Sequence, residues 1–464
     1  MPTVETQTVR IMIHEINAKS RECVTSLPPE LAERFSLSAG DKLSVKVGRV
    51  TKEAVVRIEP SLSVSKVSPL GLSDGLLRLF GLSRGCSLHA QRTVSGVRLG
   101  PVVGILAPRR SGLAKPYQAQ TSLFRRVIAA GEELGVLVYV FDFHDILWKE
   151  RRVRGYTFCQ NRWVMRLYPL PDVVFDRASG IFPGGSLRAD KARRRLVEDL
   201  GIKLFNTRVG NKMRMYKLMH ADELLRKHLP PTYKVQGSGI VSRLVAKHGA
   251  VYLKPQNGAQ GKGIIRLRRV KDGVAYTLTL KDYRQVRGRA ARVGEALSRL
   301  RTQVALSSYL AQPDLNLLRI NGRICDMRVL VQKDRDGAWH VTGVAVRAGA
   351  AGRVISNLHG GGRSLRLERL LKEALGADEE KRRRMQEEIE NLAIRIAEVL
   401  ERSTICLGEL GVDLGIDRQG RIWIIEANSR TGRAVFRRCG MHEAARLADR
   451  RPLLYAMHLA GFTT

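Results

Sequence analysis

The sequence predicts a multidomain protein of mixed α/β and α+β class, and three observations lead to this prediction. A helix–turn–strand unit occurs twice within the first 96 residues, a strand–helix–strand pattern begins at Pro101, and strands joined by tight turns follow from about Asn206. A chain of 464 residues is long enough for several separately packed domains. We therefore expect a β-rich repeat domain at 1–96, a parallel α/β domain at 97–205 and an α+β domain at 206–464.

The repeat in the first domain has a constant offset, because residues 31–43 align with residues 76–88 and Phe35 matches Phe80. Each copy has the pattern of a short helix, a glycine turn and an alternating strand such as 42–47. A unit of this kind used twice resembles the pseudo-twofold arrangement of a double-psi β-barrel. That is a likeness of fold, and it carries no chemistry by itself.

The second domain has the pattern of a parallel sheet. Residues 102–106 form an apolar strand, 118–134 an amphipathic helix and 136–141 another strand, which is the order of a crossover connection. Residues 171–176 supply a further strand. No GxGxxG follows Leu106, so the sequence does not predict a dinucleotide site there.

The amino-acid composition limits the classes of partner that the protein binds. The chain has 80 Lys and Arg against 44 Asp and Glu, a formal net charge of +36, which attracts anions and nucleic acids without specificity. The excess is mostly arginine and is spread along the chain, so a general arginine bias is the main alternative to a nucleic-acid or anionic-polymer partner. The apolar runs are of strand length, so we expect no membrane-spanning helix.

Six scattered cysteines without a CxxC pair disfavour a zinc site or a disulfide framework. The first residues lack the basic and apolar segments of a secretory signal. Together these features predict a protein of the reducing cytoplasm. Four aromatic residues in the second domain stand among basic ones and either line an acceptor site or, as we favour, belong to the domain core: Tyr156, Phe158, Trp163 and Tyr168.

Two alternating runs near the C-terminus, 411–416 and 421–428, flank the turn composition Asp-Arg-Gln-Gly. A four-residue loop would place Asp413 opposite Ile424, and the alternation of side chains would bring Asp413, Glu426 and Asn428 to one face. Oxygen ligands without His or Cys favour Mg²⁺ or Mn²⁺ over zinc. The alternative is a set of polar residues that face solvent on an edge strand.

A second pattern surrounds Lys254, which ends a strand that begins at Val251. The loop 257–263 contains three glycines, which let backbone N–H groups approach phosphate oxygens, and Lys262 adds positive charge. It is no P-loop, because Gly263 and then a strand follow the lysine. A plain hairpin turn is the alternative.

A third pattern lies on the hairpin that runs from Cys325 through a turn at 334–337 to Arg347. The alternation places Asp326, Arg328 and Arg347 on one face, where two arginines make a fork for phosphate or carboxylate. A salt-bridge ladder on the surface would explain the same pattern. A flexible glycine segment with Asn357 before it follows soon after.

The order of these patterns (lysine, glycine loop, basic strand face, acidic hairpin) resembles the ATP-grasp ligases over about residues 100–460. Within them the chain looks like the spore-coat-associated YheC/YheD subgroup, with glutathione synthetase and the ribosomal-protein glutamate ligases more distant. The motifs that carry the likeness are Asn211-Lys-Met-Arg-Met-Tyr-Lys, Leu229-Pro-Pro-Thr232, Asp326-Met-Arg, Ser356-Asn-Leu-His-Gly-Gly and Glu426-Ala-Asn428. The resemblance implies an ATP-grasp fold after the two N-terminal domains, with a lid subdomain at about 230–310.

The resemblance also implies a role for each site residue. Lys212 and Lys254 look like the lysines that contact the ATP phosphates, and catalysis falls to Arg347, Arg328 and Lys254. Asp413, Glu426 and Asn428 are similar to the ligands of Mg²⁺ or Mn²⁺. The other nucleotide-binding residues are then Asn257, Gly258, Gln260, Gly261, Lys262 and Gly263 of the lid, Gln312 and Leu315 of the hinge, Asp326 and Asn357.

The implied activity is ATP-dependent joining of a carboxylic acid to an amine through an acyl-phosphate, with ADP as product. The substrates are small molecules or peptides, an anionic polymer or a spore component, and the location is cytoplasmic or associated with the spore. Arg430 stands where relatives commonly carry proline, and Arg433 adds more charge beside it. We expect both residues to reshape the substrate mouth. The alternatives are a spore-associated ATP-binding protein without turnover and a basic protein that binds nucleic acid or an anionic polymer.

Overall fold

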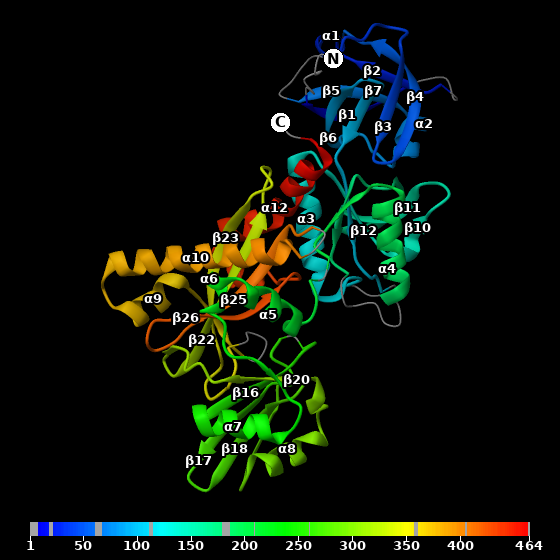
Figure 1. Ribbon diagram of the computed structural model, residues 1–464. Helices are drawn as coiled ribbons and strands as arrows, with labels where there is room; N and C mark the ends of the chain where they lie inside the picture. Colours follow the sequence, from blue (N-terminus) through cyan, green and yellow to red (C-terminus); the bar gives the residue numbers. More distant parts are fainter. Residues whose placement is uncertain are drawn as a thin grey trace. The chain divides into compact units, whose positions relative to one another are not determined.

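The chain forms two compact units, which Figure 1 colours along the sequence. The first unit comprises Met1–Thr207, Lys333–Ala338 and Leu447–Thr464, and the second comprises Arg208–Gln332 and Trp339–Arg446. The computed structural model describes residues 8–17, 22–60, 67–110, 115–178, 186–207, 209–258, 260–356, 361–403 and 406–462.

The first unit begins with a closed barrel of seven strands. The repeated unit is present in both copies, since α1 (Pro29–Arg34) leads into β3 and α2 (Asp74–Phe80) leads into β6, and each strand then pairs with the antiparallel strand that follows it. Phe35 and Phe80, the matched residues of the repeat, are both buried in the barrel core. In barrel order the strands are β1 (Thr8–Ile16), β5 (Ser68–Ser73), β2 (Val24–Leu27), β4 (Val50–Ile58), β3 (Lys42–Val47), β7 (Gly96–Gly100) and β6 (Ser87–Thr93).

The predicted parallel sheet follows. Strand β8 (Val102–Leu106) pairs in parallel with β9 (Leu137–Phe141), and α3 (Thr121–Leu134) makes the crossover after the short helix η1 (Gln118–Gln120). The sheet order is β10-β11-β9-β8-β13-β14, with β12 paired to β11. Its other elements are η2 (Phe143–Asp145), β10 (Ile146–Leu147), β11 (Arg152–Cys159), β12 (Arg162–Pro169), β13 (Val173–Asp176), α4 (Ser186–Arg194), η3 (Arg195–Asp199) and β14 (Lys203–Phe205).

The four aromatic residues of this domain differ in their surroundings. Tyr168 is buried and stacks on Tyr139 with ring centroids 4.6 Å apart, so it belongs to the core. Trp163 and Phe158 contact each other edge to face with centroids 5.3 Å apart, and they are half-buried together with Tyr156. The core interpretation therefore holds for Tyr168, whereas the other three lie at the surface of the sheet.

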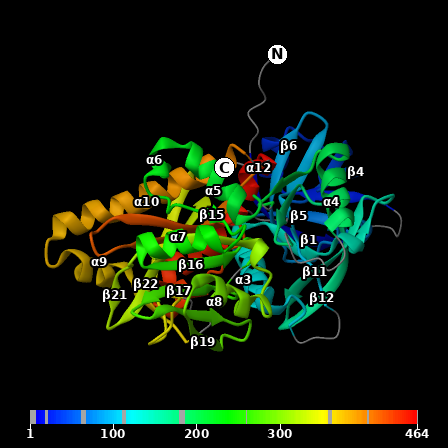
Figure 2. The same cartoon turned by 60° about the horizontal axis from the view of Figure 1, so that its bottom comes forward.

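The second unit contains two sheets. The first has the order β15-β20-β16-β17-β18-β19, and α7 and α8 pack on one of its faces (Figure 1 and Figure 2). Leu253, Leu267 and Leu278 of the strands meet Leu244 and Leu297 of the helices there. Its elements are β15 (Tyr233–Lys234), α7 (Ser238–His248), β16 (Ala250–Pro255), β17 (Ile265–Val270), β18 (Gly273–Thr279), β19 (Gln285–Ala290), α8 (Val293–Arg301), η4 (Leu306–Ser308) and β20 (Tyr309–Pro313).

The second sheet has the order β24-β23-β22-β25-β26, with β21 paired to β22. Helix α10 packs its apolar face on this sheet through Ile389, Ile396 and Leu400, while most of the charged residues at its start are exposed. The elements are α5 (Lys212–Ala221), α6 (Glu223–Arg226), β21 (Arg319–Ile320), β22 (Arg323–Lys333), β23 (Trp339–Ala348), β24 (Arg363–Arg366), α9 (Leu367–Leu375), α10 (Glu379–Glu401), β25 (Glu409–Ile416), β26 (Ile422–Asn428) and α11 (Ala434–Arg438). The last helix is α12 (His442–Ala460).

The sequence-based fold class is confirmed, since the first unit holds a barrel and an α/β sheet and the second unit is α+β. The α/β sheet is mixed, because β9, β8, β13 and β14 pair in parallel whereas β10, β11 and β12 add antiparallel pairings. The double-psi connection and the three domain boundaries stay predictions. All six cysteines are free thiols. Among the residues that the structure describes, no helix is long and apolar enough to cross a membrane.

A buried histidine makes the packing of the first unit sensitive to pH. Nε2 of His89 in β6 lies 2.9 Å from the carbonyl oxygen of Leu134 at the end of α3, and Nδ1 is buried without a partner. Burial lowers the pKa of His89, although the Leu134 carbonyl partly opposes the shift. The unfolded chain therefore takes up a proton before the folded chain does, and stability is complete above the unfolded pKa of about 6.5 and falls as the pH drops below it.

We expect the opening free energy of β6, measured by hydrogen exchange and corrected for intrinsic rates, to decrease between about pH 7 and about pH 5. His89→Gln should remove most of this decrease. The control His248→Gln changes an exposed histidine of α7 and should leave the decrease in place. An unchanged pH dependence in the His89→Gln protein would contradict the assignment.

Candidate functional site

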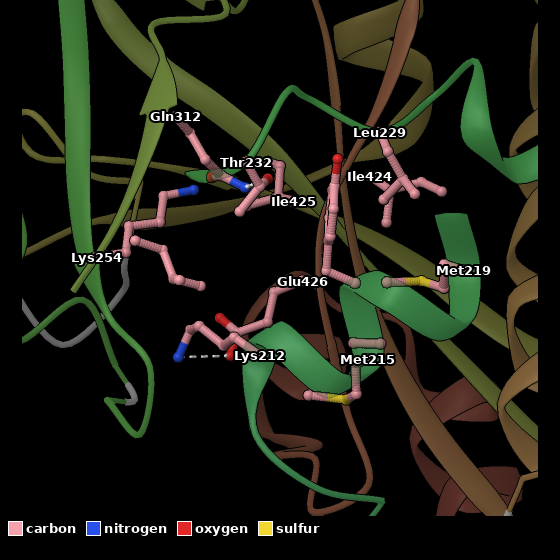
Figure 3. A pocket seen from close by; sticks show the side chains of 13 residues that line it. Lys212, Met215, Met219, Leu229, Thr232, Lys254, Gln312, Ile424, Ile425 and Glu426 are labelled. Carbon is pink, nitrogen blue, oxygen red and sulfur yellow. Dashed lines mark hydrogen bonds and ion pairs between the residues drawn. The ribbon is translucent and has the colours of Figure 1, made fainter. Parts of the chain in front are cut away.

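Lys212 is the first residue of α5, and the helix cap fixes where its side chain starts. Oδ1 of Asn211 accepts a hydrogen bond from the backbone N–H of Arg214 at 3.0 Å, which satisfies a free donor of the first turn. Nζ of Lys212 lies 3.1 Å from Oε1 of Glu426 on β26 and also donates to the carbonyl oxygen of Gly258. Figure 3 shows the ion pair between the helix and the strand.

Lys254 lies on β16, across the pocket from α5 (Figure 3). The alternation along the strand places Leu253 in the core beneath α7 and turns Lys254 to the other face. Burial lowers the pKa of Lys254 to about 8, while Glu426 opposes the shift and Lys212 adds to it. A lysine in these surroundings gains from an anion that replaces its missing water.

The pocket between β16 and α5 has an apolar part and a polar part. Met215 and Met219 of α5 face Leu229 and Ile424 on the apolar side, as Figure 3 shows. The residues that line it are Lys212, Met215, Tyr216, Met219, Leu229, Thr232, Lys254, Leu310, Gln312, Ile424, Ile425, Glu426 and Ala427.

Gln312 gives this pocket a hydrogen-bond acceptor that has no donor. Its Nε2 donates to Oγ1 of Thr232 at 2.8 Å, whereas its Oε1 is buried and makes no hydrogen bond. A buried carbonyl oxygen without a donor costs about 1–3 kcal/mol, so the pocket is arranged to receive a donor at this point. Leu315, the second predicted hinge residue, is half-buried and is not among the lining residues.

The C-terminal hairpin has a different register from the predicted one. Ile416 pairs with Ile422 rather than Arg421, and Asp413 pairs with Glu426 rather than Ile424. The loop is longer because Oδ1 of Asp417 accepts from the backbone N–H of Arg421 at 2.9 Å, and a β-bulge next to Asp413 adds a second residue.

The bulge still leaves the predicted oxygen ligands on one face. Asp413 lies directly opposite Glu426, and Gly411 lies directly opposite Asn428, so the alternation brings Asp413, Glu426 and Asn428 together. Ile424, which the sequence placed on the same face, lies opposite Leu414 on the other. The register predicted from the sequence was therefore wrong, but it correctly placed the three polar residues on one face.

Asp413 is held between two arginines. Its Oδ1 lies 2.5 Å from Nε of Arg328, and its Oδ2 lies 3.0 Å from Nη2 of Arg347. Burial by itself would raise the pKa of Asp413, but Arg328 and Arg347 hold it below its ordinary value. The carboxylate is therefore ionised although only 5% of the residue is exposed.

Asp326 also binds Arg347, because its carboxylate accepts hydrogen bonds from Nε and Nη2 of Arg347 at 2.6 Å each. The hydroxyl of Ser356 donates to the same carboxylate. Burial opposes the charge of Arg347, yet Asp326 and Asp413 raise its pKa above the ordinary value. The predicted common face of Asp326, Arg328 and Arg347 is thus confirmed by contact. The alternative of a surface ladder is wrong, because Asp326 and Arg347 are buried.

The glycine loop folds back on its own sheet. The carbonyl oxygen of Gly263 accepts from the hydroxyl of Tyr309 at 2.9 Å, and its N–H donates to Thr279 at 2.8 Å. Gly263 has a φ of +74°, which a side chain would strain. The ammonium of Lys262 lies 5.3 Å from the centre of the Tyr283 ring and is not among the residues that line the pocket.

The other predicted loop residues take different places. Gly258 contacts Lys212 through its carbonyl oxygen, Asn257 is exposed, and Gln260 accepts from the hydroxyl of Tyr283 at 3.4 Å. Gly261 has a φ of +73°. Asn357 lies outside the described residues.

The oxygen set on the hairpin fits a hard divalent cation, because two carboxylates and one amide share a face and contain no soft donor. In the described part of the chain no group of three or more His, Cys, Asp and Glu side chains has the arrangement of a metal site. A cation at Asp413, Glu426 and Asn428 would compete with Lys212 for Glu426 and with the two arginines for Asp413.

The expectation that Arg433 reshapes the substrate mouth is wrong. Arg433 is 3% exposed and forms an ion pair with Glu409, which is 0% exposed and also accepts from Nε2 of Gln332 at 3.1 Å. Residue identity alone could not reveal this partner, which stands 24 positions earlier on β25. Sequence reasoning also missed Met215 and Met219, whose spacing of four on α5 is the signal for one shared helix face.

A family model described as "YheC/D like ATP-grasp" matches residues 201–459. The chain belongs to this family. Endospore coat-associated protein YheD of Bacillus subtilis (strain 168) is 30% identical over 373 residues, which cover 78% of this chain and 80% of that protein. Endospore coat-associated protein YheC of the same strain is 25% identical over 307 residues, which cover 65% and 82%.

Solved structures give more distant likenesses. ATP-grasp ligase PsnB, complexed with a phosphomimetic variant of its minimal precursor, Mg and ADP, is 15% identical with a TM-score of 0.41, and the match covers 76% of this chain and 99% of that chain. The D-alanine-D-alanine ligase from Coxiella burnetii is 14% identical with a TM-score of 0.42, covering 78% and 97%. The assignment of the chain to its family rests on the family model and on the YheD relative.

The lowered pKa of Lys254 can be measured directly. After reductive methylation with ¹³C-formaldehyde, we expect one lysine signal to titrate with a midpoint of about 8. Lys254→Arg should remove this signal and thereby assign it. A midpoint near the ordinary lysine value of about 10.4 would contradict the buried environment.

The buried pair Glu409–Arg433 should be essential for the stability of the second unit. Glu409→Gln leaves the guanidinium of Arg433 without its counter-charge, so we expect a loss of about 3–5 kcal/mol in urea denaturation. The double substitution Glu409→Gln/Arg433→Met removes both charges and should recover most of the loss. A single variant as stable as the parent protein would show that the pair is not closed in solution.

Proposed function

We propose that the protein is an ATP-dependent ligase that joins a carboxylic acid to an amine through an acyl-phosphate and releases ADP. The observation that carries the proposal is the pocket of the second unit, in which an apolar part, a buried acceptor without a partner and two lysines converge. These are the parts that a purine base and its phosphates require. Membership of the ATP-grasp family supports the same assignment.

The apolar side of the pocket suits the adenine ring. Met215, Met219 and Leu229 give flat contact area without fixed polarity, and Oε1 of Gln312 would accept from the exocyclic amine of adenine. A guanine ring carries an oxygen at this position and would leave Gln312 without a donor. The pocket therefore favours ATP.

The polar side suits the phosphates. Lys212 and Lys254 approach from opposite walls, and Lys212 would exchange its contacts with Glu426 and Gly258 for phosphate oxygens. Phosphate would also restore the charged form of Lys254, whose pKa burial has lowered to about 8. Asn257 to Gly263 would close over the nucleotide as the lid and exclude water.

The hairpin would hold a magnesium or manganese ion through Asp413, Glu426 and Asn428. When bound, such an ion neutralises charge on the β- and γ-phosphates and orients them. Arg347, oriented by Asp326, and Arg328 would add positive charge where the transferred phosphoryl group develops charge.

The proposed reaction depends on the alignment of the substrate carboxylate with the γ-phosphate of ATP. An oxygen of the substrate carboxylate attacks the γ-phosphorus, the bond to the β-phosphate oxygen breaks, and ADP leaves. The amine attacks the carbonyl carbon of the acyl-phosphate, phosphate leaves with the electron pair, and the nitrogen gives up a proton. The products are an amide, ADP and phosphate.

The names of the curated relatives favour a second candidate, because both are called endospore coat-associated proteins. On this alternative the chain is a spore-associated protein that binds ATP without turnover. The two are separated by Mg²⁺-dependent ATP hydrolysis in the presence of pooled amino acids and peptides. Bound ATP with no turnover in any pool would favour the second candidate.

Glu426→Gln is the decisive variant, because it removes the carboxylate that faces Lys212 and belongs to the oxygen set. We expect substrate-dependent release of ADP and phosphate to fall by at least about a hundredfold. Glu443→Gln, which changes an exposed carboxylate of the same unit, is the control and should keep full activity. Formation of AMP and pyrophosphate in the parent protein would contradict the acyl-phosphate route.

A further inference from the structure

The sheet that carries Lys254 and Gln312 has one face on which no helix of the described residues packs, and we call it the open face. Its other face is covered by α7 and α8, and the residues that alternate with the covered leucines point to the open side. None of its six strands contains an aspartate or glutamate, whereas lysine or arginine occurs on β15, β16, β17 and β19. Sheet faces in contact with water ordinarily mix both signs of charge.

The strand registers arrange this open face in two rows. In the first row Arg266 lies opposite Tyr252 on one side and Thr277 on the other, and Thr277 lies opposite Arg287. Tyr252 in turn lies opposite Gln312, which lines the nucleotide pocket. The row therefore runs from the pocket to the outer strand β19.

The second row is parallel to the first. Arg268 lies opposite Ala250 and Ala275, and Ala275 lies opposite Arg289. The small side chains of Ala275 and Thr277 separate the arginines. The first row is partly covered, because the carbonyl oxygens of Gly352 and Val354 accept from Arg287 and Tyr252, whereas Arg268 and Arg289 of the second row are exposed. We call the four residues Arg266, Arg268, Arg287 and Arg289 the arginine face.

The guanidinium groups of two of these arginines have partners within the chain, and those of the other two have none among the described residues. Arg266 donates to Oδ2 of Asp314 at 2.7 and 2.9 Å, and Arg287 donates to Gln285 at 2.8 Å and to the Gly352 carbonyl at 3.2 Å. Arg268 and Arg289 are exposed, and within the described residues no carboxylate lies in salt-bridge reach of either. Four like charges on one small face repel one another, and Asp314 relieves only one of them.

The spacing of the arginine face matches an extended peptide. Neighbours on one strand, such as Arg266 and Arg268, are about 7 Å apart, and pairs across the middle strand are about 10 Å apart. Side chains of an extended peptide that point to one side recur at the same interval of about 7 Å. Carboxylates at alternate positions would therefore meet successive guanidinium groups, which bind carboxylates in a fork.

We propose that the arginine face binds an acidic peptide in extended conformation and leads one of its carboxylates toward the pocket. The proposal rests on the proposed function, since it names the class of substrate that the ligase would activate. The second row gives the exposed binding surface, and the first row beside it continues across the sheet to Gln312 of the pocket. An acidic peptide also supplies the reacting group itself, a carboxylate.

A single-stranded nucleic acid fits this face less well. Such sites combine basic residues with aromatic rings on which the bases stack. Tyr252 is the aromatic residue that the rows place here, its hydroxyl donates to the Val354 carbonyl at 2.8 Å, and the guanidinium of Arg266 lies 5.9 Å from its ring centre. Neither row offers a free ring for stacking.

Binding of a labelled peptide to the full chain tests the proposal. The probe is a fluorescent peptide of about 12 residues that alternates glutamate and threonine, so that its carboxylates recur at about 7 Å when extended. We expect fluorescence anisotropy to show binding that weakens with salt, and no binding of the same peptide with glutamine in place of glutamate. In Arg268→Gln/Arg289→Gln the dissociation constant should rise about tenfold, because two exposed charge pairs are lost.

The matched control is Arg243→Gln/Lys247→Gln on α7. It removes the same two charges from exposed residues on the opposite side of the same sheet. We expect its dissociation constant to stay within about twofold of the parent value. Equal weakening in both double variants would mean that net charge alone attracts the peptide, and it would overturn the proposal.

Two further measurements separate the outcomes. Binding of Mg·ATP is followed in each variant, and the arginine-face variant should bind it as the parent protein does. If the parent protein binds no ATP, the proposed function fails; if ATP binds but the peptide does not, this inference alone fails. Tighter binding of single-stranded DNA than of the peptide, lost in Arg268→Gln/Arg289→Gln, would assign the face to nucleic acid instead.

Discussion

The ion pair between Lys212 and Glu426 determines the form of the candidate site. It joins the first turn of α5 to the middle of β26, and through the carbonyl of Gly258 the same ammonium also reaches the start of the glycine loop. Helix, strand and loop come from distant parts of the sequence, and one positive charge holds all three at the polar end of the pocket. Because both partners are only partly buried, a bound phosphate or cation can take over either contact.

The buried charged side chains of the second unit occur in groups in which positive and negative charges lie in contact. Asp326 and Asp413 balance Arg328 and Arg347, and further along β25 Glu409 balances Arg433. These sets are costly to break, because a buried charge without its partner loses both water and counter-charge. Lys254 is the exception, since burial lowers its pKa and Glu426 offsets that shift only in part. That imbalance makes it the most responsive cation of the pocket.

The large positive charge of the chain has several distinct uses. Some arginines complete buried ion pairs, and others, such as Arg383 on α10, form exposed pairs within one helix that contribute little to stability. The arginine face differs from both groups, because its strands contain no acidic residue at all. A net charge of +36 therefore says less about function than the place where carboxylates are missing.

The sequence by itself determined which residues alternate, and hence much of the fold. The repeat around Phe35 and Phe80, the crossover unit after Pro101 and the polar positions of the C-terminal hairpin all follow from periods of two or 3.6 residues and from turn composition. It also placed Lys212, Lys254, Gln312 and Glu426 in one site through the family resemblance, and the structure brings these four to one pocket.

Only the tertiary structure decided what each side chain meets. The loop at Asp417 and the bulge beside Asp413 shifted the register, because a side-chain hydrogen bond and one extra residue changed the count that alternation assumes. Arg433 turned inward to Glu409, a partner on another strand that no local pattern reveals. Period and composition act over a few neighbouring residues, whereas burial and charge pairing act across strands that only folding brings together.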